Sequence, residues 1–280
     1  RVMSGGAADK PIKDASTVIV LRETANGLET FMLCRHQKSG FMGGAHVFPG
    51  GKVDAADSDP RWLGRIDRTA EEITEQLGES DPGAGLGLLV AAVRETFEEA
   101  GVLLASASEG ADLDATRREL HEGAPFIELA EGIDMKIDSA ALAPYARWIT
   151  PKMESRRFDT RFYIAVVPED QTPSHDGSET TSAVWLSPAG AIEEMHAGKI
   201  KLAPPTVRTL RWLAGFGDIA SVVADALSQK PPLIRPRLVT GERGWFLALP
   251  GDPEHPEDDA VLPGATRMVM GENGAWVDAE

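Results

Sequence analysis

The alternation of hydrophobic and polar residues predicts a strand pair near the start of the chain. β-Branched residues dominate Ser16 to Arg22, and a second strand-like run, Glu29 to Arg35, follows the turn signal Asn26-Gly27. Residues 1–15 are small and polar, so we expect them to form a flexible arm. The strand pair is followed by a glycine-rich segment from Gly40 to Gly51.

Helical patterns dominate the next part of the chain. Helices are predicted over residues 60–78 and over Leu86 to Ala100, where Gly101 provides the residue that commonly ends a helix. The second helix is amphipathic, because its large apolar side chains fall on one stripe: Leu86, Leu89, Val90, Val93 and Phe97. Residues 112–142 are predicted to be mainly helical and polar.

The second half of the chain alternates between strand and helix patterns. The final sixty residues add one more helix and two strand pairs, Leu233–Leu249 and Ala265–Val277. Before them the predicted strands are Tyr145–Thr150, Phe158–Val167 and Thr180–Leu186, and the predicted helices are Pro188–His196 and Pro204–Phe216.

The amino-acid composition argues against several classes of function. The 44 acidic and 28 basic residues give a formal net charge of −16, which argues against a nucleic-acid-binding or anionic-membrane surface. Cys34 is the single cysteine, so no internal disulfide is possible and a reducing compartment is expected. The longest apolar stretch, Leu86 to Val93, is too short to span a bilayer, and no signal peptide is visible. We therefore expect a cytoplasmic protein with no nucleic-acid or membrane partner.

Three carboxylates share one face of the predicted helix over Leu86 to Ala100. Glu95, Glu98 and Glu99 lie at spacing i, i+3, i+4, opposite the apolar stripe. Such a cluster is commonly a solvated face, yet unit charges about 4 Å apart repel by roughly 4 kcal/mol at an effective dielectric constant near 20. A hard divalent cation such as Mg²⁺ would turn that repulsion into attraction. Arg94 either positions one of these carboxylates or forms an ordinary surface ion pair.

A second motif stands upstream, Phe48-Pro49-Gly50-Gly51. Together with the segment from Arg94 to Val102 it resembles the Nudix box, G-x5-E-x7-R-E-U-x-E-E-x-G-U, where U is aliphatic. Asp57 occupies the position of the first Glu, Thr96 occupies an aliphatic position, and 36 residues separate Asp57 from Arg94 where the pattern has seven. The matched positions are Gly51, Arg94, Glu95, Glu98, Glu99, Gly101 and Val102.

This spacing implies an insertion of 29 residues inside the box. With a long insertion at this place, the chain resembles the coenzyme A diphosphatase branch of the Nudix superfamily. The resemblance extends from about residue 16 to about residue 255. The chain ends in Val277-Asp278-Ala279-Glu280, not in a Ser-Lys-Leu type of peroxisomal signal, so a cytoplasmic location is retained as the expectation. Other segments that resemble this branch are Gly40-Phe41-Met42, Ala45 to Gly51, Asp54 to Asp57, Trp148 to Pro151, Arg156 to Phe162, Leu202 to Pro205 and Leu249 to Asp252.

The resemblance implies an α/β fold, the Nudix α/β/α sandwich with a mixed β-sheet. The Nudix domain would cover residues 16–200, with the insertion at 58–86, and residues 201–280 would form a helical and β extension packed on the core. The implied activity is Mg²⁺- or Mn²⁺-dependent cleavage of coenzyme A or acyl-CoA to 3′,5′-ADP and (acyl-)4′-phosphopantetheine. Hydrolysis of ADP-ribose, NADH or capped RNA is an alternative. So is a regulator that binds a nucleotide without cutting it, and the oligomeric state is open.

The resemblance also implies roles for individual residues. Arg94 would brace a glutamate, and Glu179, six residues before Trp185, would be a further metal ligand or a base. Gly51 would contact the substrate, and the guanidinium groups of Arg35, Arg156 and Arg157 suit phosphate oxygens. The expected metal ligands are Glu95, Glu98, Glu99, Asp57 and the backbone carbonyl of Gly50.

Overall fold

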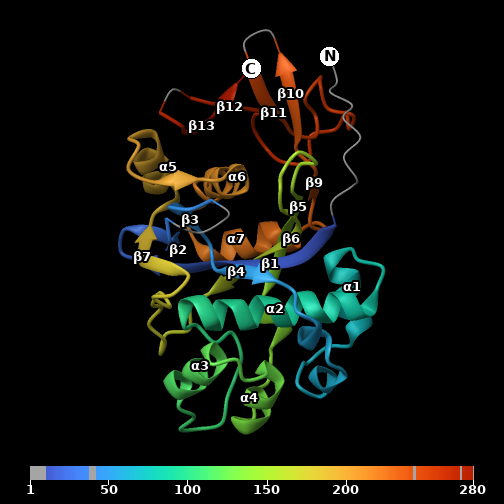
Figure 1. Ribbon diagram of the computed structural model, residues 1–280, viewed down its shortest axis with the longest axis vertical. Helices are drawn as coiled ribbons and strands as arrows, with labels where there is room; N and C mark the ends of the chain where they lie inside the picture. The colour runs from blue at the N-terminus through green and yellow to red at the C-terminus, as the bar shows by residue number, and fades with distance from the viewer. Residues whose placement is uncertain (1–10, 38–41, 242–243, 272, 280) are drawn as a thin grey trace.

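The computed structural model describes residues 11–37, 42–241, 244–271 and 273–279. A mixed nine-stranded sheet lies between two layers of helices (Figure 1), so the predicted α/β/α sandwich is confirmed. The strand order is β8 (Lys201–Leu202), β3 (Ala45–Val47), β2 (Gly27–Arg35), β1 (Ile12–Thr24), β6 (Arg157–Val166), β5 (Ala143–Ile149) and β9 (Leu233–Ile234), while β4 (Gly50–Lys52) pairs with β1 and β7 (Thr180–Leu186) with β2.

Strand β1 is the centre of the sheet. It pairs in parallel with β6 from Ile12 to Leu21, and its residues Val18 to Leu21 are fully buried because helices cover both faces of the sheet. The prediction that residues 1–15 form a flexible arm is wrong for Ile12 to Ala15, which belong to this strand. Pairing with β6, far away in the sequence, extends the strand, and a local pattern does not reveal such pairing. Residues 1–10 lie outside the described residues.

Strands β1 and β2 separate at one end, and this opening positions the site. They pair only where Leu21 to Thr24 meet Gly27 to Thr30. Further along, β3 pairs with the end of β2, and β4 pairs with β1 at Ala15 to Thr17. The turn between β3 and β4 is held by the Val18 N–H, which donates to the Pro49 carbonyl at 2.9 Å. The glycines after Pro49 therefore lie directly against the central strand.

Helix α2 (Pro82–Ala100) packs against one face of the sheet. It begins four residues before the predicted start, because the Asp81 side chain caps it by accepting from the Gly83 N–H, and Pro82 suits the first helical position. Gly101 ends it in the left-handed conformation, as predicted. The apolar stripe of α2 joins a core cluster that also includes Val18 and Phe31.

The predicted helix over residues 60–78 is wrong in its first half. The chain forms two 3₁₀ turns, Ala55–Ser58 and Pro60–Gly64, and α1 covers only Ala70–Leu77. A capping box between Thr69 and Glu72 starts α1. The next segment contains α3 (Leu113–His121) and α4 (Phe126–Gly132), which confirms the helical character predicted there.

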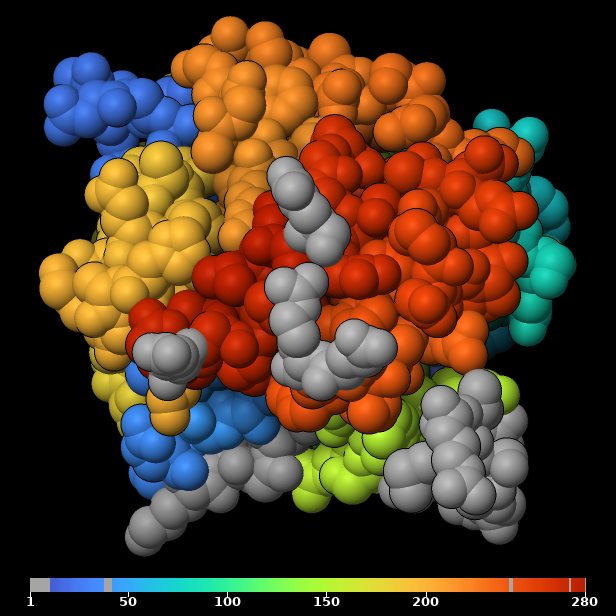
Figure 2. All heavy atoms as spheres, turned by 90° about the horizontal axis from the view of Figure 1, so that it is seen from above, coloured from blue at the N-terminus to red at the C-terminus, as the bar shows by residue number. Residues whose placement is uncertain are grey.

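The opposite face of the sheet carries the C-terminal half. Helices α5 (Pro188–His196), α6 (Pro204–Leu213) and α7 (Ile219–Leu227) lie on it (Figure 1). The two predicted strand pairs form one antiparallel sheet of β10 (Arg237–Gly241), β11 (Gly244–Ala248), β12 (Arg267–Met270) and β13 (Trp276–Ala279), which occupies the centre of the upper surface (Figure 2). Its Leu247 and Met268 share a core cluster with Ile19 of β1, so the extension packs on the main sheet.

The predicted bounds of β7 and α5 are confirmed in full. Within the part of the chain that the structure describes, no helix combines the length and the apolar character that crossing a membrane would need.

Candidate active site

Two glycines bring the backbone close to the central strand and to helix α2. A Cβ atom on Gly50 would collide with the Ser16 carbonyl oxygen, and one on Gly51 would collide with the Glu95 carboxylate. Gly50 also has a positive φ of 155°, which side chains rarely adopt. Only glycine therefore permits the close approach at position 50, and the approach places the Gly50-Gly51 backbone beside the helix carboxylates.

Glu99 is the carboxylate that contacts the glycine pair directly. The Gly50 N–H donates to Glu99 Oε2 at 2.9 Å. Burial raises the pKa of Glu99 to about 8, although the bond from Gly50 and the charge of Arg35 oppose the rise, and the charge of Glu179 adds to it. Arg35 and Glu179 are thus within electrostatic range of Glu99, and the structure brings both of these predicted residues to the site.

Arg94 is held in a buried ion pair with Asp57. Its Nε and Nη2 atoms donate to the two carboxylate oxygens at 2.8 and 2.9 Å, and Nη2 also donates to the Lys52 carbonyl at 3.0 Å. Burial opposes the charge of Arg94, but the hydrogen bonds that it donates to Asp57 and the charge of Glu95 outweigh it and raise the Arg94 pKa. The resemblance implied a bracing role for Arg94, and this geometry agrees with it.

Asp57 itself does not fit its predicted role as a metal ligand. The side chain is buried, both oxygens accept from Arg94, and Oδ2 also accepts from the Asp54 N–H at 2.8 Å. An acidic residue at this position of the Nudix box therefore fixes the arginine and does not face the site. The carboxylate of Asp57 also caps the 3₁₀ turn Ala55–Ser58, which leads into the insertion.

The other helix carboxylates contact Arg94 on its opposite side. Its Nη1 atom donates to Glu95 Oε1 at 2.9 Å and to Glu98 Oε2 at 3.4 Å. Burial raises the pKa of Glu95 to about 7, against the opposing charge of Arg94. Glu98 is the more exposed, and its Oε1 atom lies 4.0 Å from Nδ1 of His121 in α3. One arginine therefore sets the positions of two glutamates on the last turns of α2.

The donor set is chemically suited to a hard divalent cation. Glu95, Glu98, Glu99 and the Gly50 carbonyl provide only oxygen atoms, which Mg²⁺ and Mn²⁺ prefer. In the described ranges, no three acidic, histidine or cysteine side chains converge as a metal-binding group. The glutamates do not converge because Glu99 accepts from the Gly50 N–H, while Glu95 and Glu98 accept from Arg94. The residues fit the ion in chemistry and in position along the helix.

Glu179 is positioned by a loop residue that the sequence analysis missed, Asp176. One Asp176 oxygen accepts from the Glu179 N–H at 2.9 Å, and the other accepts from the N–H and hydroxyl of Thr180 at 2.9 and 2.6 Å. The Glu179 carbonyl accepts from the His36 N–H at 3.0 Å, which ties the loop to the end of β2. Asp176-Gly177 is a turn signal that would have indicated this loop.

The three predicted phosphate-binding arginines separate into two groups. Arg35 ends β2 opposite Thr180, next to Glu179. Arg157 pairs with Ile12, five residues before Thr17, where Gly50 pairs, so the two positions are roughly 17 Å apart along β1. The Arg157 side chain is buried and its Nε donates to the Thr150 carbonyl at 3.3 Å, while Arg156 is exposed. The structure does not bring Arg156 and Arg157 to the glycine pair. Gly40 and Phe41, cited for the resemblance, lie outside the described residues.

Comparison with known proteins gives a consistent picture. Residues 71–213 match the family model NUDT19 Nudix domain. The proteins named acyl-coenzyme A diphosphatase NUDT19 from Gallus gallus and Homo sapiens are 32% and 30% identical to the chain, over 82% and 85% of it and over 73% and 75% of their own lengths. The crystal structure of a NUDIX hydrolase from Alicyclobacillus acidocaldarius superposes with a TM-score of 0.62 at 26% identity, covering 79% of this chain and 97% of that one. The chain belongs to the NUDT19 Nudix domain family of Nudix hydrolases.

Proposed function

We propose that this protein is a metal-dependent diphosphatase that cleaves coenzyme A or acyl-CoA to 3′,5′-ADP and (acyl-)4′-phosphopantetheine. The observation that carries the proposal is the set of Glu95, Glu98 and Glu99 on the last turns of α2, beside the Gly50-Gly51 backbone and braced through Arg94. The substrate is supported by the relatives of 30% identity or more that are named acyl-coenzyme A diphosphatase.

The proposed cofactor is Mg²⁺ or Mn²⁺. Glu95, Glu98, Glu99 and the Gly50 carbonyl would hold the ions, and Glu179 would supply a further oxygen from its loop. When bound, such ions neutralise diphosphate charge and lower the pKa of a coordinated water, which makes it a nucleophile at neutral pH.

The chain's own residues contribute orientation and charge. The Arg94–Asp57 pair fixes the glutamates before substrate arrives, so no binding energy is needed to order them. Gly50 and Gly51 let the backbone lie against β1 and against the Glu95 carboxylate, beside the proposed metal ligands. Arg35, beside Glu179, offers a planar guanidinium to a phosphate oxygen.

A substrate panel tests the proposal. The purified protein is incubated with CoA, octanoyl-CoA, ADP-ribose, NADH and capped RNA, each with Mg²⁺, with Mn²⁺ and with EDTA, and the products are identified by mass spectrometry. We expect 3′,5′-ADP from the two CoA substrates in the metal samples only. Turnover of ADP-ribose with CoA left intact would overturn the substrate assignment, and binding of all substrates without any cleavage would favour the non-catalytic regulator.

A further inference from the structure

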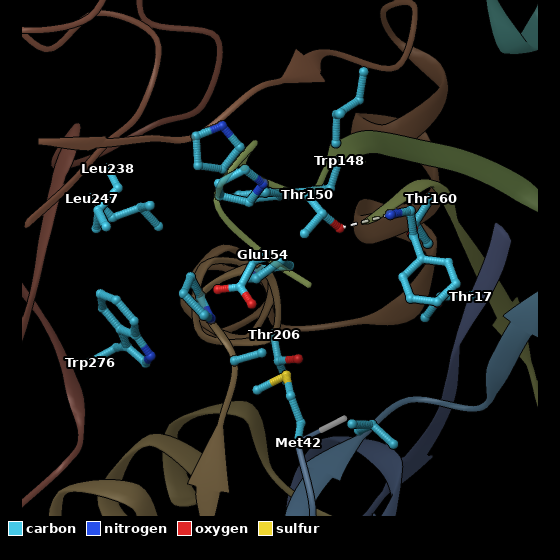
Figure 3. Close-up of a pocket in the computed structure, with 18 of the residues that line it drawn as sticks. Thr17, Met42, Trp148, Thr150, Glu154, Thr160, Thr206, Leu238, Leu247 and Trp276 are labelled. Carbon is cyan, nitrogen blue, oxygen red and sulfur yellow. Dashed lines mark hydrogen bonds between the residues drawn. The ribbon is translucent and has the colours of Figure 1, made fainter. Parts of the chain in front are cut away.

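A large cavity lies on the face of the main sheet opposite helix α2. Its volume is about 640 Å³, within the range of small-molecule sites. It lies between the main sheet and the C-terminal extension, and Figure 3 shows Leu238, Leu247 and Trp276 across it from Thr17 and Thr160. We name it the apolar cavity and define it by Phe48, Trp148, Phe158, Ala203, Leu247 and Trp276.

The lining of the apolar cavity selects against charged and strongly polar ligands. Its described lining residues are apolar except for four threonines and Glu154, and they include no lysine, arginine, histidine, asparagine or glutamine. One of the threonines, Thr150, already uses its hydroxyl oxygen to accept from the Phe158 N–H at 3.0 Å. A phosphate would find no cation among these residues, and a nucleobase would find few partners for its ring nitrogens.

Exposed hydrophobic side chains gather at this cavity. Met42, Met153, Trp245 and Met270 are 36% to 63% exposed, and all four line it. They are half of the large hydrophobic side chains exposed in the described ranges. Apolar groups collected around a hollow mark a binding site, and methionine side chains adjust to ligands of different shape.

The apolar cavity adjoins the strand segment that carries the glycine pair of the proposed catalytic site. Phe48 lines it and precedes Gly50 by two residues, so their Cα atoms lie within about 7 Å. Thr17 also lines it and is the β1 residue that pairs with Gly50. A substrate whose diphosphate is held at the glycine pair therefore has an apolar space within reach of the pantetheine arm that carries its acyl group.

We propose that the apolar cavity binds the acyl chain and thioester end of acyl-CoA, and that the C-terminal sheet sets which chain lengths are preferred. This inference rests on the proposed function, since it names the part of the substrate that the extension recognises. Leu247 and Trp276 come from β11 and β13, and Ala203 precedes α6, so the wall farthest from β1 is built by residues outside the Nudix box. The acyl chain matches this wall because it has no polar atoms to satisfy.

The first test is the dependence of kcat/KM on chain length with the wild-type protein. Each methylene that enters the cavity should raise kcat/KM by roughly threefold to fourfold from acetyl-CoA to octanoyl-CoA, until the cavity is filled. A flat dependence on chain length would overturn the proposal.

The second test fills the cavity. Ala203→Phe adds a ring from the α6 side, and Ala203 makes no side-chain capping bond that the change would remove. We expect the ratio of kcat/KM for octanoyl-CoA to that for free CoA to fall about tenfold or more, the loss of roughly two methylenes of burial. Trp276→Ala should lower the same ratio by removing wall contacts. The matched control is Ala220→Phe, on the exposed side of α7, which should leave the ratio at the wild-type value.

Equal losses for octanoyl-CoA and free CoA in a folded Ala203→Phe protein would place a shared part of the substrate, such as the adenine ring, in the cavity and overturn the proposal. Binding measured by calorimetry in EDTA separates this result from failure of the proposed function. If the wild-type protein hydrolyses no CoA substrate, tighter binding of octanoyl-CoA than of CoA, abolished by Ala203→Phe, would still support the cavity. Equal affinities would contradict it.

Discussion

Neighbouring residues of β1 serve two opposite faces of the same sheet. Ser16 points toward α2, where its hydroxyl donates to the Leu88 carbonyl at 2.6 Å, and Thr17 lines the apolar cavity. On the α2 face, charged groups are paired through short hydrogen bonds, as in the Arg94–Asp57 contact. On the other face, large apolar side chains surround an open volume. On the α2 face, ion pairs hold the proposed catalytic side chains in place. On the other face, the unfilled apolar cavity is suited to selecting among substrates.

The largest expected effect is on the α2 face at Glu98. Glu98→Gln removes a proposed metal-binding charge but keeps the size of a half-exposed side chain, so the fold should be retained. We expect the rate of CoA hydrolysis to fall by about 10³-fold, a loss typical of a group essential to proton or charge handling. Steady-state kinetics measures it, with Glu122→Gln at the exposed end of α3 as the control. A loss below tenfold would remove Glu98 from the site.

Asp57→Asn tests the ion pair that braces the site. The substitution removes the charged partner of Arg94 Nε and Nη2 and leaves the buried guanidinium with only Glu95 and Glu98, which should lower the free energy of unfolding by about 3 kcal/mol. Urea denaturation measures the change. The control is Asp59→Asn, since Asp59 is two residues further along the chain, pairs with Arg61 on the surface and should contribute less than about 1 kcal/mol. Equal effects of the two substitutions would contradict the bracing role.

A third prediction concerns Asp252, in the C-terminal extension that forms the far wall of the apolar cavity. The buried Asp252 carboxylate accepts from Arg267 Nε and Nη2 at 2.8 and 2.9 Å, and although burial opposes it, these bonds lower the Asp252 pKa. A carboxylate whose folded-state pKa is depressed stabilises the protein above its unfolded pKa, and this contribution is lost as pH falls through the folded value. Asp252→Asn should therefore cost about 2 kcal/mol at pH 7 and progressively less as pH falls below about 4. Unfolding curves at pH 7 and pH 3.5 measure it; a difference independent of pH would contradict the account.

The smallest expected effect is at Asp176, which positions the Glu179 loop. Asp176→Ala removes the acceptor for four backbone or hydroxyl donors, so kcat should fall by about tenfold while KM changes little, because a small misplacement of a catalytic group costs rate. Asp176→Asn keeps one carbonyl oxygen as acceptor and should recover part of the loss. A role limited to stability would change the unfolding transition and leave kcat unaltered in the folded protein.

Local patterns were sufficient for much of the fold. Thr180–Leu186 and Pro188–His196 were predicted with their observed bounds, because each has a period matched to its element and a clear boundary residue such as Pro188. The first part of the helix predicted over residues 60–78 was wrong because 3₁₀ turns and a helix share the same proline and glycine signals, whereas α1 confirms the second part. The first residues of β1 depend on pairing with distant β6, which local sequence does not encode.

Most candidate site residues were named from one motif, while Arg35 and Glu179 were named from outside it. The resemblance to the Nudix box indicated Glu95, Glu98, Glu99 and Arg94, which share one helix. Asp57 was predicted to be a metal ligand, yet its carboxylate binds Arg94. Residue type alone does not tell which way a carboxylate faces. Asp176 was missed although the local turn signal Asp176-Gly177 marks its loop, and the apolar cavity was missed because tertiary packing produces it. The cytoplasmic location stays a prediction.

Hydrolysis of CoA and octanoyl-CoA by the purified protein, with product identification, tests the central claim most directly. The account predicts 3′,5′-ADP together with 4′-phosphopantetheine or its octanoyl form, formed with Mg²⁺ or Mn²⁺, absent in EDTA and absent in the Glu98→Gln protein. Intact CoA and octanoyl-CoA after incubation with metal and active-site glutamates in place would contradict it.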